Sequence, residues 1–387
     1  MIDLSKRTRN ATAKTFVSDV FLQDIHAKQV ESLSNGTIGV MASTSLAVSV
    51  IGASLAQAKE LWPKHAIKQV DRLLSNEKIV PWVLFERWVP EVVGTRTSIV
   101  VAMDWTDFDA DNQATLALHL VTSHGRAMPL LWLTVDKDEL KDQRNDFEDL
   151  CLARLKEILP PGLDVTIVAD RGFGDVKLFE FIEQLNFGYC IRFRGNVQVS
   201  SSEGEKRLAA DWVGRAGRAR KLTGASITAA GFKAGAVVCV HARDMKESWC
   251  LATSHADRTA AEITNLYSRR WTIEPSFRDT KDLRFGMGLS SVRIRDPQRR
   301  DRLLLLNAMA IMLLTLLGTA GEAIGYDKYL KVNTSKKRTH SLFRQGAMLY
   351  DLIATFSEAR LRPLIEAYEE ILKQNNVLND VLAASQK

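Results

Sequence analysis

The spacing of hydrophobic residues changes along the chain. Over residues 1–75, apolar positions recur every three or four residues, which predicts helices. We expect these helices over Val20–Leu33, Ser43–Leu61 and Ala66–Leu74. From Thr97 the pattern changes to short apolar runs bounded by turn residues, which are typical of buried strands. The chain therefore begins with a helical region and continues into a sheet.

The central segment predicts three strands, a helix, a strand, a helix and a strand. The strands are expected over Ser98–Asp104, Thr115–Thr122, Met128–Val135, Asp164–Asp170 and Gly188–Phe193, and the helices over Phe147–Leu159 and Val176–Leu185. The first three strands are close enough in sequence to form an antiparallel meander. This order of elements indicates an α/β fold with a ribonuclease H-like core.

The strand and helix rhythm is interrupted after Gly195. Residues 196–258 are rich in small and β-branched residues, which predicts a β-rich insertion, and helical spacing returns at Ala260. We therefore divide the chain into five regions. They are a helical N-terminal domain (1–75), the first part of the core (76–195), the insertion (196–258), the second part of the core (259–325) and a helical C-terminal region (326–387).

One stretch has the length and apolarity of a short membrane span. Leu303–Ala320 is an uncharged run of 18 residues, most of them apolar. A fully buried helix in a large domain has the same pattern, and no second convincing span is present. We therefore expect a buried helix and no membrane contact. The first residues also lack the apolar segment of a secretory signal, so we expect a cytoplasmic protein.

The charge of the chain indicates what kind of partner it binds. The chain of 387 residues carries a net charge of +6, and its pI is about 9.1. The excess is local, because ten Lys and Arg residues face only five acids between Leu266 and Arg302. Such a basic segment favours nucleic acid as the partner. The four cysteines have no C-x-x-C spacing, so we expect reduced thiols in the core.

Four residues in the basic segment have a spacing that suggests chemistry. Tyr267, Arg270, Glu274 and Lys281 fall within an arc of about 60° if they lie on one helix. A carboxylate flanked by cations suits a metal and a phosphodiester, although a solvated face with ion pairs has the same pattern. Pro275 follows Glu274, so either a kink or the first turn of a new helix is expected there.

Two aspartates follow the apolar core of predicted strands. Asp104 and Asp170 end their strands, and strand ends in α/β proteins face the crevice where ligands bind. With Glu274 they would supply three hard oxygen ligands for Mg²⁺ or Mn²⁺. Two such ions can activate a water and stabilise a leaving oxygen at a phosphodiester. Asp107 and Asp109 are alternative ligands close to Asp104.

These residues resemble a known family. Tyr267-x2-Arg270-x3-Glu274-x6-Lys281 matches the Y-(2)-R-(3)-E-(6)-K signature of bacterial transposases of the insertion sequence 4 family. Independently, Asp104-Trp105-Thr106-Asp107 and the run from Val168 to Phe173 are similar to the family's first and second acid motifs. Val70–Asn76 and residues 333–342 resemble terminal regions of the ten-type members. The resemblance extends from about residue 65 to residue 350.

The resemblance implies a cut-and-paste DDE transposase with a hairpin intermediate. Its metal-binding triad would be Asp104, Asp170 and Glu274, with two Mg²⁺ or Mn²⁺ ions. Tyr267, Arg270 and Lys281 would hold phosphates beside the cleavage point.

The resemblance also implies a homodimer on paired terminal repeats of double-stranded DNA. Trp249 would stack on a flipped base, or else it is a core residue of the insertion. Lys68 and Arg72 give the helix before the core a basic side, which suits DNA-end reading or simply a solvated surface. Two other functions stay open, a metal-dependent endonuclease without strand transfer and a domesticated DNA-binding protein.

Overall fold

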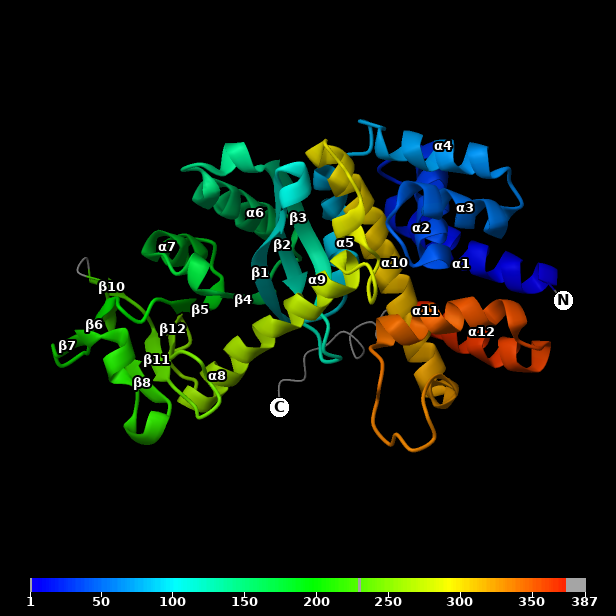
Figure 1. Cartoon of the computed structure of the whole chain (residues 1–387). Helices are drawn as coiled ribbons and strands as arrows, with labels where there is room; N and C mark the ends of the chain where they lie inside the picture. Colours follow the sequence, from blue (N-terminus) through cyan, green and yellow to red (C-terminus); the bar gives the residue numbers. More distant parts are fainter. Residues whose placement is uncertain (1, 229–230, 374–387) are drawn as a thin grey trace.

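Helices form the N-terminal part of the protein (Figure 1). The computed structural model describes residues 2–228 and 231–373. Its first helices are α1 (Ile2–Phe21), α2 (Ala27–Ser43), α3 (Val48–Lys59), α4 (Pro63–Leu74) and α5 (Pro81–Val93).

The first two helices expected from sequence are wrong in extent. The one expected over Val20–Leu33 is broken between α1 and α2, where His26 and Gln29 form a reciprocal N-terminal cap. The one expected over Ser43–Leu61 is shortened because Thr44 adopts a left-handed conformation, with φ 46°, and ends α2. Apolar spacing continues across both breaks, so it did not reveal them.

A mixed sheet forms the centre of the protein. Its core elements are β1 (Ser98–Phe108), β2 (Gln113–Leu120), β3 (Met128–Asp136), α6 (Arg144–Ile158), β4 (Asp164–Ala169), α7 (Val176–Gln184) and β5 (Gly188–Phe193). The predicted order of strands and helices is confirmed. β1 pairs with β2 in antiparallel orientation and with β4 in parallel orientation, and β5 is parallel to β4.

The insertion contributes to this sheet as well as to a second one. Its strands are β6 (Gln198–Ser200), β7 (Lys206–Leu208), β8 (Arg220–Thr223), β9 (Ser226–Ile227), β10 (Phe232–Lys233), β11 (Ala236–Val240) and β12 (Trp249–Thr253). β12 pairs with β5, so the large sheet has the order β3-β2-β1-β4-β5-β12-β11-β8. The remaining four strands form a small sheet at the end of the molecule farthest from α4 (Figure 1).

The segment after the insertion crosses one face of the large sheet. It consists of α8 (Ala260–Ser268), a 3₁₀ turn (Arg269–Thr272) and α9 (Ile273–Lys281). The expected single helical stripe is therefore wrong, because the 3₁₀ turn divides it. Pro275 lies in the first turn of α9, where its missing N–H leaves no hydrogen bond unmade. Of the two arrangements expected at Pro275, the structure shows the new helix.

The alternation of side chains along the strands divides the core into two layers. Ala102, Val168 and Cys190 pack against residues of α8 on one face of the sheet. Val101 and Ile167 belong to the larger cluster on the other face, which includes residues of α6 and α7. Successive residues of a strand point to opposite faces. Even-numbered positions at the end of β1 therefore face α8 and α9.

A long helix joins the N-terminal helices to the sheet. α10 (Pro297–Ala323) packs against β3, α2, α11 (Leu342–Leu352) and α12 (Glu358–Lys373). It is long and apolar enough to cross a membrane, but 89% of its most apolar 18-residue window is buried within the protein. The expectation of a buried helix over Leu303–Ala320 is confirmed.

Two arginines at the start of α10 bind the preceding helical region. The guanidinium of Arg302 donates to the carbonyls of Leu74 and Ile79, at the end of α4 and just beyond it. Arg299 forms an ion pair of 2.5 Å with Asp71 on α4. α4 is therefore fixed to the same helix that supports the sheet.

Candidate active site

Two acidic side chains share one edge and one face of the sheet. Met103 on β1 is paired with Ala169 on the parallel strand β4, so Asp104 and Asp170 follow at the same level. Each lies two positions after a residue that faces α8, Ala102 and Val168 respectively, so both aspartates lie on that face. The carboxylate of Asp170 also accepts a hydrogen bond from the backbone N–H of Gly172, at 2.7 Å, which orients it in the turn after β4.

A buried arginine lies between two of the acids. Arg270, in the 3₁₀ turn, is only 6% exposed. Its Nη2 donates to Glu274 Oε1 at 3.0 Å, and its Nη1 lies 3.5 Å from Asp104 Oδ2. Its guanidinium carbon also lies 5.9 Å from the centre of the buried Tyr267 ring. The structure therefore brings Asp104, Glu274, Arg270 and Tyr267 together.

The three acids influence one another electrostatically. Burial, helped by the charges of Asp170 and Glu274 and opposed by that of Arg270, raises the pKa of Asp104 to about 6. Like charges at close range disfavour ionisation in this way. A cation at this position would relieve the repulsion.

The donors suit a divalent cation in type, but the conformation holds them apart. Three carboxylates are the hard oxygen ligands that Mg²⁺ and Mn²⁺ prefer. Among residues 2–228 and 231–373, however, no three acidic, histidine or cysteine side chains are close enough to hold one ion together. The guanidinium of Arg270 takes the position between Asp104 and Glu274 that a shared cation would need.

The two alternative acids lie elsewhere. Asp107 is three residues after Asp104 on β1, so its side chain points to the opposite face of the sheet. Its carboxylate pairs with Lys137 at 3.1 Å. Asp109 lies beyond the strand and pairs with the same lysine at 2.5 Å. Both carboxylates therefore belong to a separate ion-pair cluster, and the geometry favours Asp104 for the site.

Lys281 is held by β1 rather than by the acids. Its Nζ donates to Thr106 Oγ1 at 2.9 Å and to the Asp107 carbonyl at 2.7 Å. Burial lowers the pKa of Lys281, while Asp107 and Asp109 raise it. The ammonium therefore lies farther along the same strand that carries Asp104.

Trp249 lies beside Tyr267, and Trp271 lies beside Trp249; of these two tryptophans, the sequence analysis identified only Trp249. Trp249 is 8% exposed, and its ring meets the edge of Tyr267 at 4.9 Å and that of Trp271 at 5.5 Å. Trp271 is 51% exposed, so it offers the larger free surface. Its position between Arg270 and Glu274 was the signal that could have identified it.

A buried acid behind β1 was also missed. Glu148 on α6 is 4% exposed and accepts a hydrogen bond of 2.8 Å from the indole of Trp105. Burial raises the pKa of Glu148 to about 7. Because Trp105 follows Asp104, this acid supports the strand from the face opposite to Arg270. The signal available in the sequence was the position of Glu148 within the amphipathic pattern of this helix.

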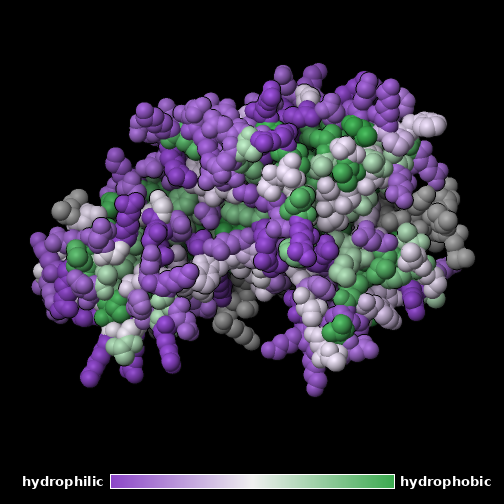
Figure 2. All heavy atoms as spheres, in the orientation of Figure 1, coloured by the Kyte–Doolittle hydropathy of each residue, from purple (hydrophilic) through white to green (hydrophobic). Residues whose placement is uncertain are grey.

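Three other polar regions surround the centre of the molecule. The predicted DNA contacts Lys68 and Arg72 line a groove of about 710 Å³ on α4, away from the acids. A pocket of about 540 Å³ beside Asp170 is lined by Arg171, Arg192 and Arg194, and Glu247 pairs with the first two at 2.7 and 2.8 Å. Hydrophilic residues cover most of the face shown in Figure 2.

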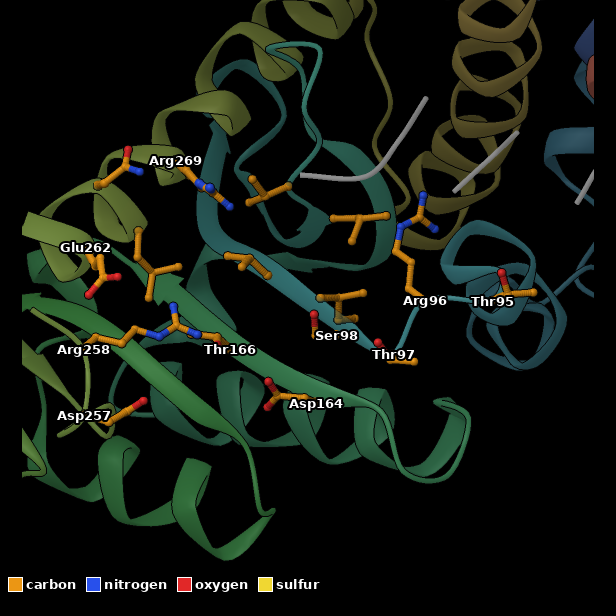
Figure 3. Close-up of a pocket in the computed structure, with 16 residues that line it drawn as sticks. Thr95, Arg96, Thr97, Ser98, Asp164, Thr166, Asp257, Arg258, Glu262 and Arg269 are labelled. Carbon is orange, nitrogen blue, oxygen red and sulfur yellow. The ribbon is translucent and has the colours of Figure 1, made fainter. Parts of the chain in front are cut away.

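The third region lies at the opposite edge of the large sheet. It is a pocket of about 630 Å³ at the start of β1 and β4, lined by both basic and acidic residues (Figure 3). Arg269 lines this pocket, whereas its neighbour Arg270 contacts the acids. The pocket contains none of the site residues expected from sequence, and its balanced charge gives no preference for a polyanion.

Comparison with known proteins assigns the chain to a family. No curated protein matches it. The family described as "Transposase DDE domain" matches residues 95–313, which is more than half of the chain and extends from β1 into α10. This range includes Asp104, Asp170 and Glu274 together with the insertion. The chain therefore belongs to the DDE transposases, enzymes that cleave and transfer DNA.

Proposed function

We propose that this transposase is a cut-and-paste enzyme of the insertion sequence 4 type, with a ribonuclease H-like core. The observation that supports the proposal best is the placement of Asp104 and Asp170 on adjacent parallel strands, with Glu274 reaching the same region from α9. The Y-(2)-R-(3)-E-(6)-K spacing supports the finer family assignment.

The three carboxylates act as the metal-binding triad in this proposal. When bound, two Mg²⁺ or Mn²⁺ ions supply an activated water or hydroxyl and neutralise the leaving oxygen. Tyr267, Arg270 and Lys281 hold the phosphates next to the cleavage point. Their basic groups lie on the same side of β1 as Asp104, which suits contact with one DNA strand.

The order of DNA steps is the one that the resemblance to the insertion sequence 4 family implies, with one site acting several times. Water first nicks the transposon end, and the freed 3′-hydroxyl then attacks the opposite strand to give a hairpin. Resolution and strand transfer reuse the same carboxylates, and two copies act on paired ends. Bending the strand back requires a displaced base to be held, and Trp249 with Trp271 provides an aromatic surface beside Tyr267.

The basic regions on either side of the carboxylates suit a DNA path. Lys68 and Arg72 are exposed on α4 and would contact the transposon end. The pocket formed by Arg171, Arg192 and Arg194 would contact phosphates on the other side of Asp170. Contacts of this kind position DNA without reading its sequence.

A cleavage assay on end-containing DNA with Mg²⁺ tests the proposal. The wild-type protein should give nicked DNA, then hairpins, then joined products. Asp104→Asn, Asp170→Asn and Glu274→Gln should bind the ends but not cleave them, and Asp107→Asn is the matched control that should still cleave.

The rival functions predict different products. An endonuclease without strand transfer would give cut DNA but no joined product, and a domesticated binding protein would give neither. Full cleavage by any one of the three variants would remove that residue from the site.

A further inference from the structure

We propose that Arg270 is the resident counter-ion of the metal-free active site, displaced by the divalent cation and thereby released to bind a DNA phosphate. The inference rests on the proposed metal-binding role of Asp104 and Glu274. It adds an order of events, in which metal binding makes the phosphate-binding group available.

The contacts of Arg270 with the acids carry the inference. One nitrogen of its guanidinium is 3.0 Å from Glu274 and another is 3.5 Å from Asp104, so a single positive charge bridges two proposed metal ligands. Asp104 is 166 residues away from Arg270 in sequence, whereas Glu274 is only 4 residues away. A contact of this kind joins α9 to β1 across the site.

The burial of Arg270 increases the energetic importance of its contacts with Asp104 and Glu274. Arg270 is 6% exposed, and its Nε is buried without a hydrogen-bond partner. An unpaired charge in such surroundings is costly in free energy, so the two carboxylates stabilise the buried guanidinium and the guanidinium stabilises them. In the absence of metal, the bridge therefore stabilises the arrangement of acids that would otherwise repel one another.

A metal and the guanidinium cannot occupy the same gap. Glu274 has a side chain that is 58% exposed, so it is free to rotate toward a cation. Once a divalent ion neutralises the acids, the attraction that holds Arg270 on them is lost. A planar guanidinium with several donors then suits a phosphate, which it can bind through two parallel hydrogen bonds.

The second proposed phosphate-binding cation is held by different groups. Lys281 is hydrogen bonded to Thr106 and to a backbone carbonyl, and neither group is a proposed metal ligand. Metal binding therefore releases Arg270 but has no direct effect on the partners of Lys281. Of these two residues, only Arg270 is therefore expected to change its contacts when the metal binds.

Metal titration of the full-length protein without DNA tests the inference. Mn²⁺ binding is measured by isothermal titration calorimetry for the wild type, Arg270→Gln and Arg270→Lys. Arg270→Gln should bind Mn²⁺ roughly tenfold more tightly, because the competing cation is gone. Arg270→Lys, which keeps the charge on a shorter reach, should fall between them. Arg269→Gln removes a neighbouring charge that faces the pocket in Figure 3, and it should bind as the wild type does.

Thermal melting gives a second measurement that does not depend on activity. Without metal, Arg270→Gln should melt at a lower temperature than the wild type, because the acids are left without a counter-ion. Saturating Mg²⁺ should raise its melting temperature by more than it raises that of the wild type. If Arg270→Gln cannot be purified in folded form, Arg270→Lys supports the same comparison.

The outcomes separate this inference from the proposed function. Equal Mn²⁺ affinity in the wild type, Arg270→Gln and Arg270→Lys would overturn the counter-ion role, provided that Asp104→Asn and Glu274→Gln weaken Mn²⁺ binding. Unchanged Mn²⁺ affinity in those two acid variants would instead show that the proposed metal site is wrong. Tighter binding by Arg269→Gln of the same size would reduce the effect to general charge and would also overturn the inference.

Discussion

The buried carboxyl of Glu148 makes the stability of this protein depend on pH. Glu148 lies on α6 and accepts a hydrogen bond from the indole of Trp105, which is adjacent to Asp104. The nearest opposite charge is that of Arg144, at 3.9 Å, and the side chain of this arginine is largely exposed. Weak pairing leaves burial as the main influence on the pKa of Glu148.

The size of the effect follows from that pKa. Burial raises it from 4.5 to about 7, and a rise of this size corresponds to about 3 kcal/mol. A carboxyl whose pKa is raised in the folded state destabilises the protein when it ionises. There is no penalty below pH 4.5; it grows as the pH rises toward 7 and is complete above 7.

Replacing Glu148 with Gln removes the ionisation but keeps an oxygen that can accept the indole hydrogen bond. We expect Glu148→Gln to match the wild type near pH 4.5 and to be more stable by up to about 3 kcal/mol at pH 8. Urea unfolding of the metal-free proteins at both pH values measures this difference.

The exposed Glu157 on the same helix supplies the control. Glu157→Gln should show no comparable gain at pH 8. Because other buried acids titrate in both proteins, only the difference between Glu148→Gln and the wild type is informative. A difference that is the same at both pH values would refute the reasoning.

Three further predictions concern DNA contacts and packing. Lys281→Ala should reduce cleavage more than end binding, and a titration with salt should show the logarithm of wild-type affinity falling by about 0.9 per phosphate contact for each unit of log salt concentration. Salt-independent binding would argue against backbone contacts. Trp271→Ala should keep the wild-type melting temperature but accumulate nicked DNA with fewer hairpins, whereas Trp249→Ala should lose about 3 kcal/mol of stability because its ring is buried. Gly346→Ala should lower the melting temperature markedly, since an added Cβ would collide with the Leu314 carbonyl of α10; unchanged melting would disprove that close approach.

Local patterns predicted the strand order well because each strand carries its own signal. Gly188–Phe193 was predicted with the bounds that the structure shows. Asp104 and Asp170 were found because apolar runs stop at those residues, although β1 continues past Asp104 to Phe108 and β4 ends one residue before Asp170. The same kind of information fails for breaks between helices, where a cap such as His26 ends one apolar pattern and begins another of the same period.

Contacts between distant segments were beyond reach of these patterns. Nothing in the local sequence of the insertion shows that β12 pairs with β5, because that register depends on the fold of the whole sheet. The approach of Arg270 to Asp104 likewise joins residues 166 positions apart. Spacing placed Arg270 on the same stripe as Glu274, but it could not show that the guanidinium would contact both acids.

The attachment of α4 to α10 has a consequence for how the enzyme measures DNA. α10 has 27 residues and is about 40 Å long, and Arg299 and Arg302 tie its first turns to α4 and the residues that follow it. With α4 as the proposed DNA-end-binding helix, this attachment fixes the distance between the bound end and the cutting site. An end with extra base pairs between the two should then be bound but left uncut, rather than cut at a shifted position.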